Sequence, residues 1–231
     1  MSPKTVERVA VIGGTGNAGF GLALRWAAAG IDLVIGSRAE ERAKEAADRL
    51  MSVLPAAVVE GMENPRAASS ADVVVVTVPF SGQAATYRSI AGSLRQGAVI
   101  VDTTVPLAAS VGGKPTRVLG VWEGSAAQQA AALLPDHAQV CAGFHSLSAS
   151  ALADLDSELE GDVLVCGPKA AKPVVRELVE AIPRLGYVDA GPLEFARLVE
   201  PITALLIGIN HRYKTDRSGI RITGLPPRLS S

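Results

Sequence analysis

Short apolar runs alternate with longer amphipathic stretches along most of the chain. Residues 9–12 are continuously apolar and residues 73–78 are interrupted only by Thr77, which indicates strands buried on both faces rather than strands with one exposed face. Residues 19–29 and 39–51 instead carry apolar positions at helical spacing. Alternating strands and helices of this length predict an α/β fold with a parallel, doubly wound sheet and right-handed crossovers.

The same alternation continues beyond these elements. Further strands and helices are expected, the strands at residues 33–35, 58–59, 98–101 and 139–142 and the helices at residues 64–71, 81–94 and 125–134. Residues 73–78 form the most apolar run and are therefore expected near the centre of the sheet. Residues 103–124 contain two prolines and a pair of glycines, which predicts a long loop with room for a small hairpin.

A second unit follows near the carboxyl end. Strands are expected at residues 163–166 and 187–189 around a helix at residues 170–182, and one long final helix is expected from about 194 to 211. The change of pattern near residue 160 predicts two parts. These are a Rossmann-like domain over residues 1–160 and a smaller C-terminal α/β domain over residues 161–231, which would complete the active-site cleft.

Bulk composition narrows the class of protein. Of the 231 residues 48% are hydrophobic but only 4% aromatic, which suits the aliphatic core of a helix-covered parallel sheet. A formal net charge of -1 gives no attraction to nucleic acid or to a membrane, and no apolar run approaches the roughly 18 residues of a membrane span. Cys141 and Cys166 lie in or beside apolar runs and are expected to be buried thiols, not metal ligands or a disulfide. With no signal segment before the first strand, a cytoplasmic protein is expected.

A glycine-rich turn follows the first strand. The run RVAVIGGTGNAGFGLA places Gly14, Gly16 and Gly19 in the G-x-G-x-x-G pattern between a strand and a helix. Such glycines allow a tight turn, close approach of a pyrophosphate and close packing of the helix on the sheet. The backbone N–H groups at the helix start then face the phosphates. We therefore expect dinucleotide binding at this turn, with Asn17 and Ala18 included.

The end of the second strand indicates which dinucleotide is bound. NAD-binding folds usually carry an acidic residue there to hold the ribose 2′-hydroxyl, whereas this chain has Ser37 and Arg38. A hydroxyl and a planar guanidinium suit a 2′-phosphate instead. Arg42 lies one helical turn beyond Arg38, and Thr15 lies in the glycine turn. These residues predict binding of NADP(H).

Further candidates follow the next strands, because the carboxyl ends of strands in an open parallel sheet form the ligand crevice. Val78 and Pro79 follow one strand, and Val105 and Pro106 hold a comparable position after another. They are expected to lie along the ribose or nicotinamide. His145 also follows a strand and is the candidate for a residue that lines the pocket or donates a proton. No Lys-x-x-x-Asn or Tyr-x-x-x-Lys arrangement offers another proton donor.

Seven stretches, spread over nearly the whole chain, resemble the sequences of one known protein family. They read VIGGTGNAGFGLALRWAAAG, VIGSRAEERA, VVVTVPF, GSAAQQAAALLP, LADLDSELEGDVLVCG, DAGPLEFARLVEPITALLIGIN and HRYKTDRSGIRITGL. With them the chain resembles the NADPH-dependent coenzyme F420 reductases, also called F420:NADP oxidoreductases. The DAGPL signature followed by ARLVE, and the TGNAG turn paired with SR, are specific when taken together.

The resemblance implies a Rossmann domain with a smaller C-terminal domain, usually in a homodimer. It implies direct hydride transfer between the nicotinamide of NADP(H) and the 5-deazaflavin of coenzyme F420, both small-molecule co-substrates. It also implies roles for particular residues: the 2′-phosphate positions are Thr15, Ser37, Arg38 and Arg42, the cleft walls are Val78, Pro79, Val105 and Pro106, and the residues beside the deazaflavin are His145 and Leu147.

Direct hydride transfer needs no covalent nucleophile and no metal, so a site without an evident acid–base pair agrees with the resemblance. Two alternatives stay open. One is an NADPH- or reduced-F420-dependent reductase of a small imine or carbonyl metabolite on the same fold, and the other is a non-catalytic NADP(H) sensor. The first gains weight because the family often has His-Thr-Val/Ile-Pro-Ala where residues 145–149 read His-Ser-Leu-Ser-Ala.

The carboxyl-terminal stretch is rich in basic residues. It carries Arg212, Lys214, Arg217, Arg221 and Arg228 against a single acid, Asp216. The coenzyme that the resemblance implies has a phosphodiester and an acidic glutamyl tail, so these side chains are candidates for contacting that tail. A solvated terminal segment or a dimer contact is the other interpretation.

Overall fold

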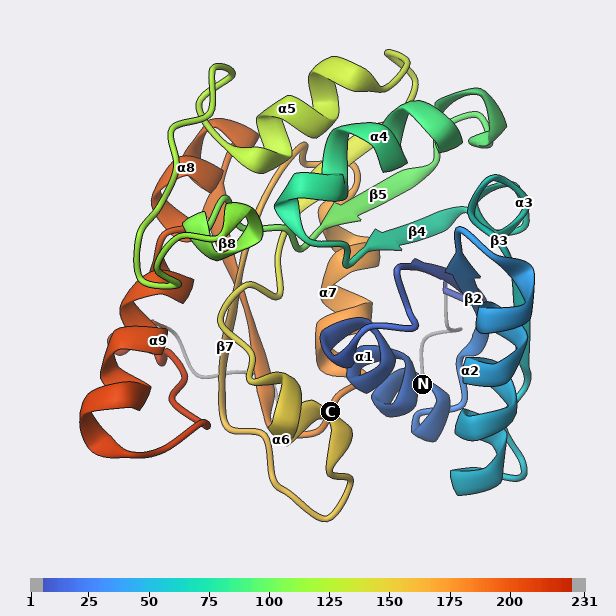
Figure 1. Ribbon diagram of the computed structural model, residues 1–231, viewed down its shortest axis with the longest axis horizontal. Coiled ribbons are helices and arrows are strands. Elements are labelled where there is room, and N and C mark those ends of the chain that lie inside the picture. The colour runs from blue at the N-terminus through green and yellow to red at the C-terminus, as the bar shows by residue number, and fades with distance from the viewer. Residues whose placement is uncertain (1–5, 226–231) are drawn as a thin grey trace.

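Eight strands form one sheet in the computed structural model, which describes residues 6–225 (Figure 1). Their order across the sheet is β3-β2-β1-β4-β5-β6-β7-β8, and the strands are β1 (Arg8–Ile12), β2 (Asp32–Ser37), β3 (Val59–Glu63), β4 (Val73–Val76), β5 (Val99–Asp102), β6 (Gln139–Ala142), β7 (Gly161–Cys166) and β8 (Leu185–Gly191). The apolar strand β4 lies at the centre, between β1 and β5, as predicted.

Every neighbouring pair of strands is parallel except one. Strands β6 and β7 run antiparallel and meet at Ala142 and Cys166, so the predicted parallel, doubly wound sheet is present with one antiparallel pairing. The connection between them carries only the five-residue helix α6 (Ala149–Ala153). Because no helix crosses the sheet there, the chain re-enters from the edge at which it left, and β7 must run in the opposite direction.

Helices cover both faces of the sheet, because alternate residues of each strand point to opposite sides. Val9 and Val11 of β1 share a core cluster with four helices on one face, which are α6 and also α1 (Asn17–Ala28), α2 (Glu40–Val53) and α7 (Lys172–Glu180). Ala10 and Ile12 of the same strand pack with three on the other, α3 (Asn64–Ser69), α4 (Phe80–Ile90) and α5 (Ala126–Leu133). Cys141 and Cys166 are buried and unpaired, as expected.

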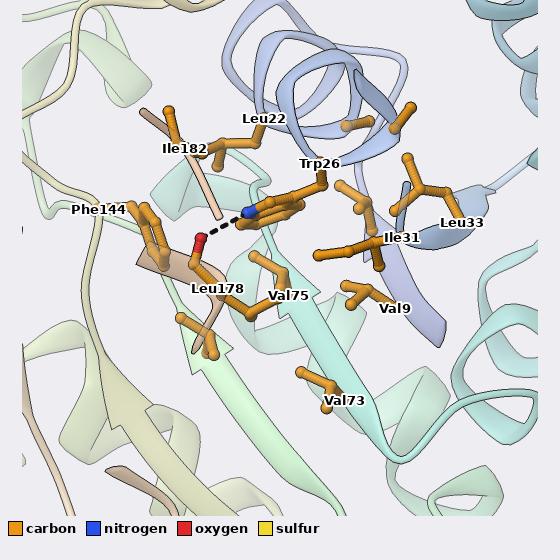
Figure 2. Packing of buried hydrophobic residues seen from close by; sticks show 14 of the residues in the cluster. Val9, Leu22, Trp26, Ile31, Leu33, Val73, Val75, Phe144, Leu178 and Ile182 are labelled. Carbon is orange, nitrogen blue, oxygen red and sulfur yellow. Dashed lines mark hydrogen bonds between the residues drawn. The ribbon is translucent and has the colours of Figure 1, made fainter. Parts of the chain in front are cut away.

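Helix α1 is tied to parts of the chain that come much later in sequence. The indole N–H of Trp26 donates to the main-chain carbonyl of Leu178 at 2.9 Å, as Figure 2 shows, and the ring meets Phe144 edge-on at 5.5 Å. The buried guanidinium of Arg25 donates to the main-chain carbonyls of four residues around the end of α6, which are Ala151, Leu152, Asp154 and Ser157.

The carboxyl-terminal third departs from the predicted single helix over residues 194–211. A 3₁₀ turn (Leu193–Phe195) and helix α8 (Ala196–Val199) are separated from helix α9 (Ile202–Tyr213). Pro201 lies at the break, since its ring removes a main-chain donor and clashes with a continuing helix. The break leaves Glu200 between the two helices.

Two short 3₁₀ segments complete the described chain. One, Ala91–Ser93, follows α4, and the other, Ala108–Val111, lies in the loop after β5, where Leu107 and Val118 form an antiparallel bridge. The predicted loop with a small hairpin is therefore confirmed. None of the helices within residues 6–225 is long and apolar enough to span a bilayer. The division at residue 160 stays a prediction, while β7 and β8 extend the same sheet beyond it.

Candidate active site

The glycine turn has the tight geometry that its sequence predicted. Gly13 directly follows β1 and has a φ of +82°, and the N–H of Gly16 donates to the Gly13 carbonyl at 3.0 Å. A Cβ on Gly19 would lie 2.3 Å from Thr77 Oγ1 and 2.8 Å from the Gly13 carbonyl. Helix α1 can therefore pack this closely on the sheet only with glycine at that position.

The start of α1 is suited to an anion. Gly16 is its N-cap and offers no side-chain cap, and no acidic residue lies in the first turn. A Cβ built on Gly16 would meet only the Gly13 carbonyl, at 3.4 Å, so the space above the turn is open. The first main-chain N–H groups and the helix dipole thus point positive charge at that space.

A cleft of about 430 Å³ opens beside this turn at the carboxyl ends of β1, β2 and β4. It brings together most of the predicted dinucleotide residues, namely Thr15, Gly16, Ser37, Arg38, Arg42, Val78 and Pro79. Arg38 and Arg42 are exposed, and the neighbouring Glu40 pairs with Lys44 and Arg66 instead. Two guanidinium groups therefore border the cleft, and neither belongs to an ion pair within residues 6–225.

Sequence reasoning missed part of this cleft. Asn64 lines it from the start of α3, directly after the point where β3 ends beside Ser37. Gly13 and Thr77 also line the cleft, and α4 contributes Ser81, Gly82, Ala85, Thr86 and Ser89 from one face. Small residues at 81, 85 and 89 recur every four positions, and that spacing was the available signal.

The other predicted site residues lie outside the lining of this cleft. Val105 and Pro106 follow β5, and His145 and Leu147 follow β6, at the same edge of the sheet. His145 is buried, and neither ring nitrogen has a well-formed hydrogen bond, while its main-chain carbonyl accepts from Thr203 Oγ1 at 2.8 Å. Burial lowers the pKa of His145 to about 4, so its imidazole is neutral at neutral pH.

Two buried carboxyl groups lie close to this region. Burial raises the pKa of Asp102 to about 6, against the opposing effect of its hydrogen bonds with Thr104. Glu200 accepts from the N–H groups of Ala126 and Ala127 at the start of α5, at 2.8 and 3.0 Å. Burial, with a smaller contribution from the charge of Asp102, raises the pKa of Glu200 to about 7.

These carboxyl groups predict how stability depends on pH. The folded protein holds a proton on Glu200 between the ordinary pKa of 4.5 and about 7, where the unfolded chain releases it, so stability rises as the pH falls through 7. His145 acts in the opposite direction only below its ordinary pKa of 6.5. The melting temperature should therefore rise by roughly 2–4 °C for each kcal/mol gained as the pH falls from mildly alkaline values to 6.5. A melting temperature that falls over this interval, or an identical rise in Glu200→Gln, would contradict the assignment.

The basic carboxyl-terminal residues divide into two groups. Arg217 pairs with Asp154 at 3.2 Å, and Arg221 pairs with Glu160 at 2.8 Å. Pairing with the protein's own acids favours a structural role for these two arginines. Arg212 and Lys214 are exposed at the end of α9, and Arg228 lies outside the described residues.

The chain is similar in sequence to known proteins along its length. Residues 8–106 match the sequence model of the family described as "NADP oxidoreductase coenzyme F420-dependent". The chain is 44% identical to the F420-dependent NADP reductase of Methanothermobacter thermautotrophicus over 98% of its own length and 99% of the relative's. It is 41% identical to the F420-dependent NADP reductase of Methanothermobacter marburgensis, over 95% and 99% of the two chains.

A crystal structure from Arthrobacter sp. FB24 shares the fold. It superimposes with a TM-score of 0.78 over 94% of this chain and 99% of that chain, at 24% sequence identity. Mycobacterium tuberculosis 3-hydroxyisobutyrate dehydrogenase superimposes with a TM-score of 0.62 at 15% identity, over 90% and 62% of the two chains. At these identities the likeness supports the Rossmann-like α/β fold alone.

Proposed function

Since this chain belongs to the family of F420-dependent NADP reductases, it is an oxidoreductase that transfers hydride between NADP(H) and coenzyme F420, and we propose that the cleft beside the glycine turn holds the dinucleotide. One observation supports this placement most. The anion-attracting start of α1 and the side chains of Ser37, Arg38 and Arg42 border the same cleft. A pyrophosphate fits the first feature and a ribose 2′-phosphate fits the second.

The open space in the cleft can accommodate a dinucleotide. The open position above Gly16 lets a phosphate approach the main chain, which any side chain there would obstruct. Thr15 would add a hydroxyl donor next to the 2′-phosphate, and Val78 and Pro79 would lie against the ribose and nicotinamide. Gly14, Asn17 and Ala18 would contribute main-chain groups, since they form the turn and the first residues of α1.

The two bound co-substrates supply the redox chemistry, a hydride carried directly between nicotinamide and deazaflavin. The task of the chain is to orient the two rings and exclude water, which can supply roughly 7–11 kcal/mol of barrier reduction. Val105 and Pro106 would form a wall of the cleft, and Leu147 would lie on the deazaflavin side. His145 would line that side as a neutral imidazole, because a group with a pKa of about 4 is a poor reservoir of protons at neutral pH.

The reaction is tested with purified protein, NADPH and oxidised coenzyme F420. Reduction of the deazaflavin bleaches its visible absorbance, and we expect bleaching with NADPH and little with NADH. Absence of bleaching in a protein shown separately to bind NADPH would contradict the function. Reduction of an imine or carbonyl metabolite, the alternative that the altered residues 145–149 raised, is not favoured by the relatives.

We also propose that the protein is a homodimer. Several large apolar side chains are exposed on the final helical segments, among them Phe195, Leu198, Leu205 and Tyr213. Exposed apolar side chains, where they form one contiguous patch, mark sites of protein–protein interaction. Light scattering that gives the mass of a single chain at micromolar concentration would contradict the dimer.

We also propose that the protein is located in the cytoplasm. Cys141 and Cys166 are buried as free thiols, the usual state of cysteine in a reducing compartment. Cell fractionation tests this, and recovery of the protein outside the cytoplasm would contradict it.

A further inference from the structure

A buried polar unit lies directly behind the segment that follows β5. Asp102 is fully buried, and both of its carboxylate oxygens face hydrogen-bond donors. Oδ1 accepts from the main-chain N–H of Thr104 at 2.6 Å and also from the Thr104 hydroxyl. Oδ2 accepts from the side-chain amide of Gln83 at 2.6 Å. Each carboxylate oxygen therefore has an N–H donor of its own.

Gln83, which is also fully buried on α4, joins this unit to α5. Its Nε2 lies 2.7 Å from Thr104 Oγ1 and 2.9 Å from the main-chain carbonyl of Ala126. Its Oε1 accepts from the side-chain amide of Gln129 at 2.7 Å. One amide thus connects α4, the end of β5 and the start of α5, and Thr104 directly precedes the wall residues 105–106.

The unit carries its negative charge without a cation. No ion pair among residues 6–225 includes Asp102. The ionisable groups close to it are Tyr87 from α4, His145 after β6 and Glu200 after α8, and none of them is positively charged at neutral pH. Burying an unpaired charge costs stability, so an apolar residue would serve the fold alone better. A role of Asp102 in the active site would explain why the protein keeps a buried charge that lowers its stability.

We propose that Asp102, Gln83 and Thr104 are positioning residues for hydride transfer, whose hydrogen bonds fix residues 104–106 against the nicotinamide and deazaflavin rings. This inference rests on the proposed function, since it takes Val105 and Pro106 as a wall of the site. The ionised carboxylate is the form that fits best, because it accepts from all of these donors and charged acceptors make the stronger hydrogen bonds. Protonation therefore weakens these hydrogen bonds and loosens the segment.

The first test replaces Asp102 with asparagine, which has the same shape. Because each oxygen of Asp102 faces an N–H group, the new NH₂ must oppose one of them in either orientation. We expect kcat with coenzyme F420 to fall roughly 10- to 100-fold, the effect of a small misplacement of reacting rings. The Kd for NADPH should stay close to that of the original protein, since the phosphate contacts lie at the glycine turn and the end of β2.

The pH profile separates positioning from a merely structural role. In the original protein kcat should fall as the pH is lowered through about 6, where Asp102 gains its proton, and this fall should be absent in Asp102→Asn. A variant that is only less stable would keep the fall. An Asp102→Asn protein with unchanged kcat, or with the same pH profile as the original, overturns the proposal.

A pair of variants at Thr104 keeps the test decisive if Asp102→Asn does not fold. Thr104→Ser retains the hydroxyl that Asp102 and Gln83 contact, whereas Thr104→Val removes it at similar volume. A low kcat in the valine variant with recovery in the serine variant supports the proposal, and equal kcat values overturn it. If the original protein transfers no hydride at all, the proposed function fails instead, which is a separate result.

Discussion

Replacing Arg38 with alanine should weaken the binding of NADPH roughly 10- to 100-fold while leaving the weaker binding of NADH unchanged. A hydrogen bond to a charged group contributes about 1.5–3 kcal/mol, and the planar guanidinium can make two to a phosphate. Arg38 borders the cleft, and no ion pair among the described residues includes it, so its loss breaks none of these pairs. Titration of the protein with each dinucleotide measures the two Kd values.

Arg88 provides the matched control. It is an exposed arginine on α4 that does not line the cleft, so Arg88→Ala changes the net charge by the same amount without touching the proposed phosphate site. Equal losses of NADPH affinity in both variants would mean that Arg38 acts through overall charge. A loss of NADH affinity as large as that for NADPH would contradict a contact with the 2′-phosphate.

Replacing Gly19 with alanine should destabilise the protein and abolish tight dinucleotide binding. By helix propensity alone, alanine inside a helix is favoured over glycine by about 0.5–1 kcal/mol. The new methyl group, however, would lie 2.3 Å from Thr77 Oγ1 and 2.8 Å from the Gly13 carbonyl. Overpacking of this kind costs about 1–3 kcal/mol, which outweighs the propensity, and relief requires α1 to move away from the turn that it completes.

Gly92 is the control for this substitution, because a Cβ built there meets no atom within 4 Å. We expect Gly92→Ala to keep both the melting temperature and the Kd for NADPH. We expect Gly19→Ala to lower the melting temperature by several degrees and to lose binding at concentrations that saturate the original protein. Unchanged values for Gly19→Ala would show that α1 can shift without consequence for the site.

The sequence was most informative where local residues decide the structure. The glycine turn, the central strand β4 and the grouping of Ser37, Arg38 and Arg42 follow from short motifs and from the rule that ligands bind at the carboxyl ends of parallel strands. The break at Pro201 was also readable, since proline rarely continues a helix. It was missed because the apolar spacing on both sides suggested one continuous helix.

Features that depend on distant parts of the chain could not be predicted in this way. Asp102 resembles an ordinary strand-ending acid until the fold places Gln83 against it, and nothing near His145 in sequence signals that its ring is buried. The antiparallel strand β7 likewise follows a connection whose helix α6 is hydrogen-bonded to Arg25, far away in sequence.

The hydrogen bonds between α1 and residues much later in the sequence affect how fast the chain folds. The hydrogen bonds from Arg25 and Trp26 span 126 to 152 positions of sequence, so the first helix made during synthesis obtains these partners only when most of the chain exists. Contacts this remote in sequence slow folding, because a long loop must close before they contribute. The nascent amino-terminal half therefore exposes an apolar helix face for a long time, and in the cell this protein should depend on chaperones until residue 178 has left the ribosome.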